Sequence, residues 1–145
     1  MKKRALRQDA IRRIVRAERI RTQRDLVKRL EDEGFVCTQA TVSRDIGQMG
    51  LRKLSEGVYV LAEDLHLQRM VSELVVDVVG TGALVLVKST PGTAQGVAAA
   101  LDGAELDGIL GSIAGDDTVL VIATGEESAV SVRDSIDKYR TIGRG

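Results

Sequence analysis

Apolar residues recur at helical spacing in three successive stretches of the first 50 residues. Over residues 6–16 they recur every four positions, with further apolar residues beside them, so one face of a helix is apolar and the outer face is basic. The apolar positions of this stretch are Leu6, Ala10, Ile11, Ile14 and Val15. The spacing therefore predicts an amphipathic first helix.

Typical start and stop residues mark two further helices. Thr22, with Asp25 three residues later, resembles a capping box, and Gly34 is well placed to end that helix. Thr38 is a typical N-cap for the third helix, and Gly50 supplies its stop. Their apolar positions are Leu26, Val27 and Leu30 in the second helix and Val42, Ile46 and Met49 in the third.

A short β-type ribbon follows the helices. Leu51–Ser55 and Val58–Leu61 are its arms, with the turn signal Glu56-Gly57 between them. Three helices and a hairpin form the element order of a winged helix-turn-helix, so we assign residues 1–62 to such a DNA-binding domain. Helical residues follow, and we interpret residues 63–73 as a connector helix between two domains.

The second half changes from a helical period to alternating β-rich runs and helices. The predicted elements are strands at Leu74–Val79 and Ala83–Lys88 joined at Gly80-Thr81-Gly82, a helix at Thr93–Leu101, strands at Ile109–Ala114 and Val119–Thr124, and a helix at Glu126–Tyr139 with apolar Val130, Ile136 and Tyr139. The order ββαββα fits a two-layer sandwich with helices on one face of an antiparallel sheet. Residues 74–145 thus form a second domain, and the fold class is α+β.

Charge is unevenly divided along the chain, although the net charge is zero. Residues 1–64 hold 15 Lys and Arg against 10 Asp and Glu, whereas residues 65–145 hold 6 against 11. The basic excess is largest in residues 1–30, with 12 basic and 3 acidic residues. This division indicates a polyanionic partner for the first half and a different partner for the second.

The sequence carries no signal for a membrane or an export route. No apolar run approaches the ~18 residues that span a bilayer, and the start MKKRALRQ leads into a charged helix, unlike a signal peptide. The lone Cys37 cannot form an intrachain disulfide and fits a reducing compartment. We therefore expect a cytoplasmic protein with no membrane partner.

The third helix has a small, polar outer face opposite its apolar stripe. Arg44 can pair with a guanine edge or clamp a phosphate, and the hydroxyls of Thr41 and Ser43 can reach phosphate oxygens. A solvated face in an unrelated helical bundle is the alternative, which the basic first helix and the ribbon disfavour. The candidate DNA-contacting residues are Gln39, Ala40, Thr41, Ser43, Arg44 and Gln48, and the expected phosphate ligands are Lys2, Lys3, Arg4, Arg7, Arg12, Arg13 and Lys53.

Two adjacent carboxylates, Asp116 and Asp117, lie in the turn between two predicted strands. Because their charges repel, the pair is costly unless water or a cation compensates it. A solvated turn, a divalent metal and an organic cation such as a guanidinium remain open. Gln95 and Asp102 lie seven residues apart on one predicted helix and share a face. With the hydroxyl of Ser112, these groups could hold an amino acid by its ends.

An enzymatic second domain is the alternative to a ligand-binding one. Its least unlikely form is metal-assisted hydrolysis at the paired aspartates. His66 is the only histidine and lies in the predicted connector, and Cys37 belongs to the first domain. The second domain therefore has no histidine to activate a nucleophile and no cysteine to act as one. We therefore expect no catalytic residues and no enzyme.

Two motifs resemble one family over nearly the whole chain. They are TQATVSRDI (38–46), and GSIAGDDT (111–118) with the upstream PGTAQGVAAALD (91–102). The chain resembles the bacterial arginine repressors. The resemblance implies a regulator of arginine metabolism that binds palindromic operators through Ser43 and Arg44, with L-arginine as co-repressor and no metal.

The resemblance also implies how the second domain assembles and holds its ligand. Such domains form trimers that pair into a hexamer, with arginine bound between the trimers. The paired aspartates of a neighbouring subunit bind the guanidinium of that arginine. The residues corresponding to the arginine pocket are Gln95, Asp102, Ser112, Ala114, Asp116 and Asp117. Two positions depart from the family: Ser112 stands where threonine is usual, and Gly47 replaces a common lysine, which removes a phosphate contact and costs the helix about 1 kcal/mol relative to alanine.

Overall fold

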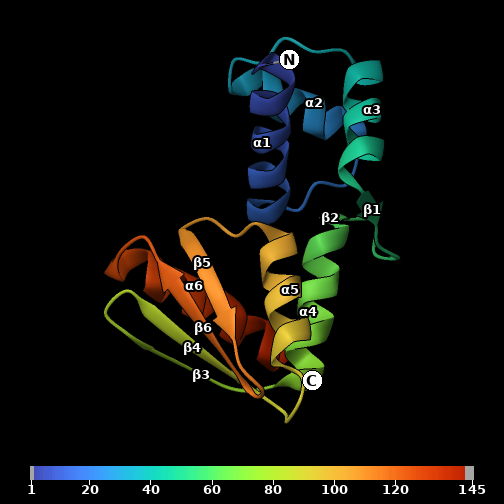
Figure 1. The fold of residues 1–145 in the computed structure, drawn as a ribbon. Coiled ribbons are helices and arrows are strands. Elements are labelled where there is room, and N and C mark those ends of the chain that lie inside the picture. Colours follow the sequence, from blue (N-terminus) through green and yellow to red (C-terminus); the bar gives the residue numbers. More distant parts are fainter. Residues whose placement is uncertain (1, 143–145) are drawn as a thin grey trace. The chain divides into compact units, whose positions relative to one another are not determined.

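The chain divides into two compact units, one ending at Ala62 and the other beginning at Glu63. The computed structural model describes residues 2–142 (Figure 1). None of the helices within residues 2–142 has the length and apolar composition needed to cross a membrane. The combination of a helical first unit and a sheet with helices in the second confirms the predicted α+β class.

The first unit is built from three helices and a short ribbon. The elements are α1 (Lys2–Ala17), α2 (Gln23–Asp32), α3 (Gln39–Met49), β1 (Leu51–Lys53) and β2 (Tyr59–Leu61). The two strands pair antiparallel, with Leu51 opposite Leu61. This is the predicted order of a winged helix-turn-helix, with ribbon arms shorter than expected.

The predicted caps set the ends of α2 and α3. The Thr22 hydroxyl accepts a hydrogen bond from the backbone N–H of Asp25 at 3.0 Å, and Thr38 accepts one from Thr41 at 3.2 Å. Gly50 ends α3 in the left-handed region, with φ of 70°, where a side chain would strain the backbone. Local sequence chemistry therefore determines where the third helix begins and ends.

The apolar faces of these helices form one core, with one correction. Its buried residues are Ala10, Ile11, Ile14, Val15, Ile20, Leu26, Leu30, Val42, Met49, Leu51 and Leu61. The prediction for Leu6 was wrong, because its side chain is 59% exposed. The buried part of α1 begins at Ala10, so Leu6 lies one turn before the core.

The second unit is a four-stranded antiparallel sheet with three helices. The elements are α4 (Ala62–Leu74), β3 (Val75–Thr81), β4 (Leu84–Ser89), α5 (Ala94–Ala104), β5 (Ile109–Ala114), β6 (Thr118–Ala123) and α6 (Glu126–Ile142). The strand order is β3-β4-β6-β5. The first hairpin turns at Gly82 and Ala83 and so begins two positions later than predicted, because Gly80 and Thr81 still pair with β4.

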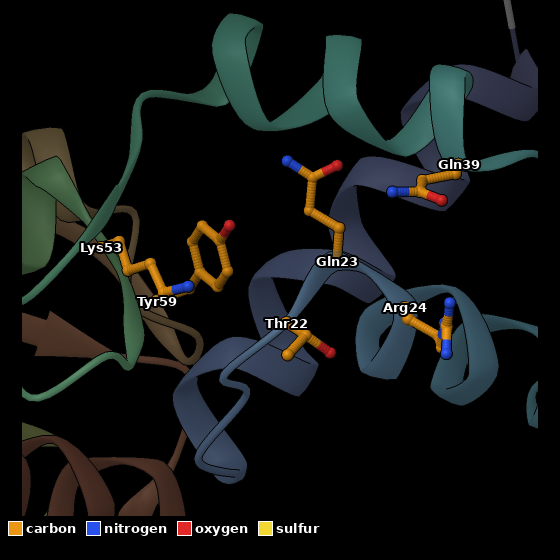
Figure 2. Close-up of a pocket in the computed structure, with 6 residues that line it drawn as sticks. All are labelled: Thr22, Gln23, Arg24, Gln39, Lys53 and Tyr59. Carbon is orange, nitrogen blue, oxygen red and sulfur yellow. The ribbon is translucent and has the colours of Figure 1, made fainter.

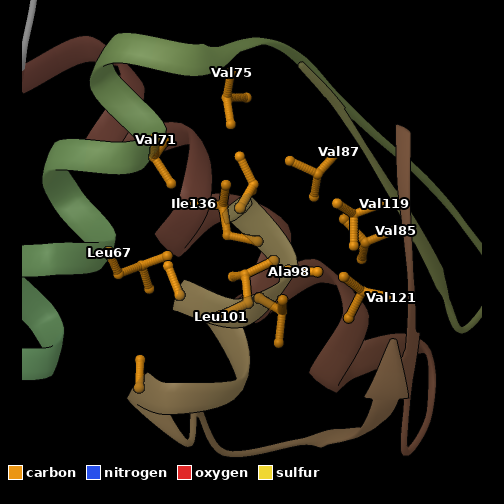
Figure 3. Close-up of a cluster of buried hydrophobic side chains, with 14 of the residues drawn as sticks. Leu67, Val71, Val75, Val85, Val87, Ala98, Leu101, Val119, Val121 and Ile136 are labelled. Atoms are coloured by element: carbon orange, nitrogen blue, oxygen red, sulfur yellow. The ribbon is translucent and has the colours of Figure 1, made fainter. Parts of the chain in front are cut away.

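All three helices pack on the same face of the sheet. Side chains of α5 and α6 meet the inward side chains of β4 and β6, and α4 adds side chains to the same core (Figure 3). Leu67 and Val71 on α4 are fully buried there, so the helix suggested as a connector contributes to the core of the second unit. Burying such a side chain stabilises a fold by about 1.5–3 kcal/mol.

The apolar stripe of α6 differs from the predicted one. Ala129, Val132 and Ile136 are buried at helical spacing, and Tyr139 packs beside them. The prediction for Val130 was wrong: it is 47% exposed, because it lies one position off this stripe.

Candidate functional site

The outer face of α3 is open to solvent, as the sequence predicts. Gln39, Ala40, Ser43, Arg44 and Gln48 are all exposed. Within the described part of the chain, no carboxylate pairs with Arg44, so its guanidinium is available to an external partner. A cationic side chain on an exposed, small-residue helix face suits contact with DNA in the major groove.

Thr41 differs from the other candidates on this helix. It is half-buried, and its hydroxyl lies 3.0 Å from that of Thr38. Because Thr41 also donates its backbone N–H to Thr38, the residue forms part of the N-cap of α3. The Thr41 hydroxyl is therefore engaged at the start of α3, and the exposed hydroxyl of Ser43 is more accessible to DNA.

The inner face of α3 carries a buried acid that our sequence analysis missed. The side chain of Asp45 is 2% exposed and accepts two hydrogen bonds from Arg7, at 2.5 and 3.0 Å, and one from Gln8 at 3.0 Å. Asp45 falls on the stripe of Val42 and Met49, so helical periodicity already placed it inside. These bonds join α3 to α1.

Burial and hydrogen bonding shift the pKa of Asp45 in opposite directions. Burial by itself raises the pKa of the carboxyl, since it disfavours the charged form. Hydrogen bonds from Arg7 and Gln8, with the charges of Arg7 and Arg4, outweigh burial and hold the pKa below its ordinary value of 3.8. The same hydrogen bond raises the pKa of Arg7. The pair is therefore ionised at neutral pH.

Several expected phosphate ligands are engaged within the protein. The expectation for Arg7 was wrong, because its guanidinium is held in the buried pair with Asp45. Arg12 pairs with Asp9 at 3.0 Å, and Arg13 with Glu33 at 2.8 Å. The remaining N-terminal cations, Lys2, Lys3 and Arg4, are exposed. Among the expected phosphate ligands of α1, those of its first turn are thus exposed and show no ion pair with another described residue.

A hollow of about 370 Å³ opens beside the start of α3. Its lining residues come from α2, α3 and the ribbon and are Thr22, Gln23, Arg24, Gln39, Lys53 and Tyr59 (Figure 2). Two of them are cationic and none is acidic. Of these residues, only Gln39 and Lys53 were predicted to contact DNA. The sequence signal for the others was the N-cap at Thr22, which marks the start of α2 in the helix-turn-helix.

The ribbon side of this hollow is held in place by three contacts. Tyr59 donates its backbone N–H to the carbonyl of Ile20 at 2.9 Å, and Arg21 donates to the carbonyl of Glu56 at 3.0 Å. The ammonium of Lys53 lies 5.4 Å from the centre of the Tyr59 ring, within the range of a cation–π contact. The hollow therefore presents positive charge from an anchored surface.

The second candidate site centres on the turn between β5 and β6. Asp116 and Asp117 are both exposed. Their backbone carbonyls accept hydrogen bonds from Ala94 at 3.1 Å and from Ser89 at 2.7 Å. The side chain of Asp117 also accepts from the Thr118 hydroxyl at 3.1 Å. The turn is thus tied to the start of α5 and the end of β4, so two adjacent charges are held in a defined place.

The other predicted residues lie on α5 and β5. The Ser112 hydroxyl donates to Asp102 at 3.2 Å, which joins the two elements. Gln95 is exposed and follows Ala94, the residue bonded to the turn. Ala114 is half-buried at the end of β5. Because four of the six predicted residues are exposed, a ligand held by one subunit alone would stay largely in water.

The ligand types that remain open differ in what they need from this site. Among the described residues, no group of three or more His, Cys, Asp or Glu side chains is arranged to hold a metal ion. A guanidinium requires less, since its paired N–H donors match carboxylate oxygens in a fork. The exposed aspartates of the turn are suited to such a cation.

Comparison with known proteins decides the family. The family model "Arginine repressor, DNA binding domain" matches residues 1–67, and "Arginine repressor, C-terminal domain" matches residues 71–138. The chain belongs to the arginine repressor family. This confirms the resemblance seen in the two motifs and makes the chain a DNA-binding transcriptional regulator.

Relatives named arginine repressor cover most of the chain. The protein of Thermus thermophilus is 44% identical, over 99% of this chain and 94% of its own length. That of Staphylococcus epidermidis is 40% identical over 94% and 97%, and that of Halothermothrix orenii is 38% identical over 75% and 80%. The match to this family therefore spans both units.

Proposed function

We propose that this member of the family is an arginine-responsive repressor of arginine metabolism that binds palindromic operators as a hexamer, with L-arginine as co-repressor. The observation that carries the proposal is the anchored turn between β5 and β6. There Asp116 and Asp117 are exposed side by side while their carbonyls are bonded to two neighbouring elements. Such a pair of fixed negative charges is a receptor for a cation.

On the DNA side, α3 enters the major groove and the cationic hollow meets the phosphate backbone. Arg44 and Ser43 lie on the exposed face that approaches the base edges. Arg24 and Lys53 line the hollow beside the start of the same helix. Because phosphate contacts release counterions, operator binding weakens steeply as salt is added.

On the ligand side, the two ends of L-arginine meet different groups. The guanidinium lies between Asp116 and Asp117, where it forms charge-assisted hydrogen bonds. Gln95, Asp102 and Ser112 take the amino-acid end. The exposure of Gln95 and Asp102 supports a site that a neighbouring subunit completes.

The outer face of the sheet supports self-association of the second unit. Val79, Leu86, Leu120 and Ile113 pair in one row across all four strands, on the face opposite the helices. Val79 is 41% exposed and Ile113 65%, and the neighbouring Leu84 is 39% exposed. An apolar surface that runs across a whole sheet is typical of an interface, and we assign it to the trimer.

L-Arginine couples the ligand site to assembly and to DNA. Without it, aspartates of facing trimers repel one another; with it, the cation bridges them, so binding favours the hexamer by mass action. A hexamer presents several DNA-binding units, and two of them engage paired half-sites with a gain in avidity. Ligand occupancy thereby controls operator occupancy.

Sedimentation velocity of the full chain tests this proposal, with and without L-arginine and a palindromic operator duplex. L-Arginine should move the protein to the hexamer and increase the DNA-bound fraction. L-Citrulline is the matched control, because a neutral urea group replaces the guanidinium. Assembly and DNA binding that ignore L-arginine, or respond equally to L-citrulline, would contradict the proposal.

A further inference from the structure

Three side chains form a hydrogen-bonded line from the buried face of α3 to its exposed face. The Gln8 amide nitrogen lies 3.0 Å from an oxygen of Asp45 and 3.1 Å from the amide oxygen of Gln48. Asp45 is buried, Gln8 is half-buried on α1, and Gln48 is exposed. The line therefore connects a buried charge to a side chain on the candidate DNA surface.

The charge at the inner end fixes the orientation of both amides. An ionised carboxylate only accepts hydrogen bonds, and Asp45 is held ionised by Arg7. Gln8 must therefore turn its NH₂ group, not its oxygen, towards Asp45. The second hydrogen of that NH₂ group points to Gln48, which must answer with its oxygen. The NH₂ group of Gln48 is left to face outwards.

This orientation limits what Gln48 can recognise. A glutamine pairs with adenine in the major groove by directing both its oxygen and its NH₂ group at the base. With its oxygen directed at Gln8, Gln48 offers a base only a donor. In the major groove guanine and thymine present acceptors with no donor on the same base, whereas adenine presents one acceptor beside a donor, and cytosine presents a donor. At adenine, a donor-only Gln48 therefore loses the two-bond contact and meets a like donor beside the single acceptor.

We infer that Asp45, acting through Gln8, sets Gln48 as a hydrogen-bond donor towards DNA, so that Gln48 selects guanine or thymine and disfavours adenine and cytosine. The inference rests on the proposed placement of α3 in the major groove. Asp45 and Gln8 are positioning residues: Gln8 bonds Gln48, and Asp45 acts on Gln48 only through Gln8. The device allows a buried ion pair to determine one position of the operator.

Selection from a pool of duplexes with a randomised half-site tests this inference. The full chain is used, with L-arginine present, as wild type, Gln8→Met, Gln48→Ala and the double variant. Gln48→Ala identifies the half-site position that Gln48 reads, as the one whose preference it removes. At that position the wild type should favour guanine or thymine, and Gln8→Met, which frees the amide to turn, should enrich adenine at least about fivefold.

The double variant separates positioning from a general structural role. It should show the same base preference as Gln48→Ala, because Gln8 acts only through Gln48. A merely structural effect of Gln8→Met would lower affinity for all half-sites alike and leave the preference unchanged. Gln8→Ala serves as a second variant, and thermal unfolding by circular dichroism verifies that each variant folds.

Three results would overturn the inference: a wild type that prefers adenine at the Gln48-dependent position, a Gln48→Ala variant that changes no position, or an unaltered preference in both Gln8 variants. Failure of the proposed function has a different signature. In that case no half-site is enriched by any of the proteins, including the wild type, and both proposals fall together.

Discussion

The carboxylate of Asp45 and the guanidinium of Arg7 join α3 to α1 across 38 positions of sequence, through hydrogen bonds of 2.5 and 3.0 Å. The side chain of Asp45 is 2% exposed and that of Arg7 16%. Removing one partner of an ion pair that is buried in this way strongly destabilises the fold, because the other charge stays buried without compensation. The orientation of the candidate recognition helix thus depends on a contact that α1 supplies.

Replacing Arg7 by alanine should destabilise the first unit by about 3 kcal/mol, because it leaves the buried Asp45 without its cation. Arg13→Ala is the matched control: its side chain is 59% exposed in its pair with Glu33, so the loss should be about 0.5 kcal/mol. The chain has two tyrosines and no tryptophan, so in a Tyr139→Phe background Tyr59 fluorescence reports urea unfolding of the first unit. Equal losses in the two variants would refute a special role for Arg7.

The lowered pKa of Asp45 predicts how this stabilisation varies with pH. Because the folded state holds the pKa below 3.8, the folded protein binds fewer protons at this group than the unfolded chain does. The contribution is therefore complete above the unfolded value and is lost as pH falls through the folded one. The stability difference between the wild type and Asp45→Asn should be constant above about pH 5 and shrink below 3.8. Urea unfolding midpoints of both proteins, measured between pH 7 and pH 2, test this. A stability difference that stays constant down to pH 2 would contradict the prediction.

Features set by neighbouring residues were predictable from the sequence. The hydroxyls of Thr22 and Thr38 cap α2 and α3, and Gly50 ends α3, because these groups act within one turn of the chain. The face that Gln95 and Asp102 share on α5 follows from helical spacing alone.

Contacts between distant elements were not predictable in the same way. Asp45 lies on the periodic inner stripe of α3, but its partner on α1 depends on how the two helices cross. The bond from Ser112 to Asp102 depends on β5 lying beside α5, which no local pattern states. Leu6 and Val130 have helical spacing but face solvent, since periodicity does not tell where a core ends.

Asp117→Asn should weaken L-arginine binding by roughly 1 to 3 kcal/mol, the size expected for a hydrogen bond to a charged group. The substitution keeps the side-chain shape and removes the negative charge that the proposed site offers to the guanidinium. Titration calorimetry measures the change, with Asp107→Asn as a control that removes an equal charge from an exposed position outside the site. Unchanged affinity in Asp117→Asn would remove this residue from the ligand site.

Ile113→Lys should dissociate the assembly into smaller species. Ile113 is 65% exposed and lies in the apolar row across the sheet, so a lysine there would bury a charge in the proposed interface. Leu6→Lys is the control, since Leu6 is 59% exposed in the other unit. Sedimentation equilibrium distinguishes the two, and an intact oligomer in Ile113→Lys would move the interface away from this face.

Gly47→Lys should strengthen operator binding, because it adds a cation to the exposed face of α3. A Cβ at Gly47 meets no atom within 4 Å, so the side chain fits without rearrangement. One added phosphate contact should make the slope of log affinity against log salt steeper by about 1. Fluorescence anisotropy with a labelled operator at several salt concentrations measures that slope.

Gly47→Ala separates charge from helix propensity in this experiment. Alanine should stabilise α3 by up to about 1 kcal/mol, since glycine is the poorer helix former, without adding a charge. It should therefore raise the unfolding midpoint of the first unit and leave the salt slope unchanged. If both variants tighten binding equally at every salt concentration, the gain comes from a stiffer helix, and Gly47 does not face a phosphate.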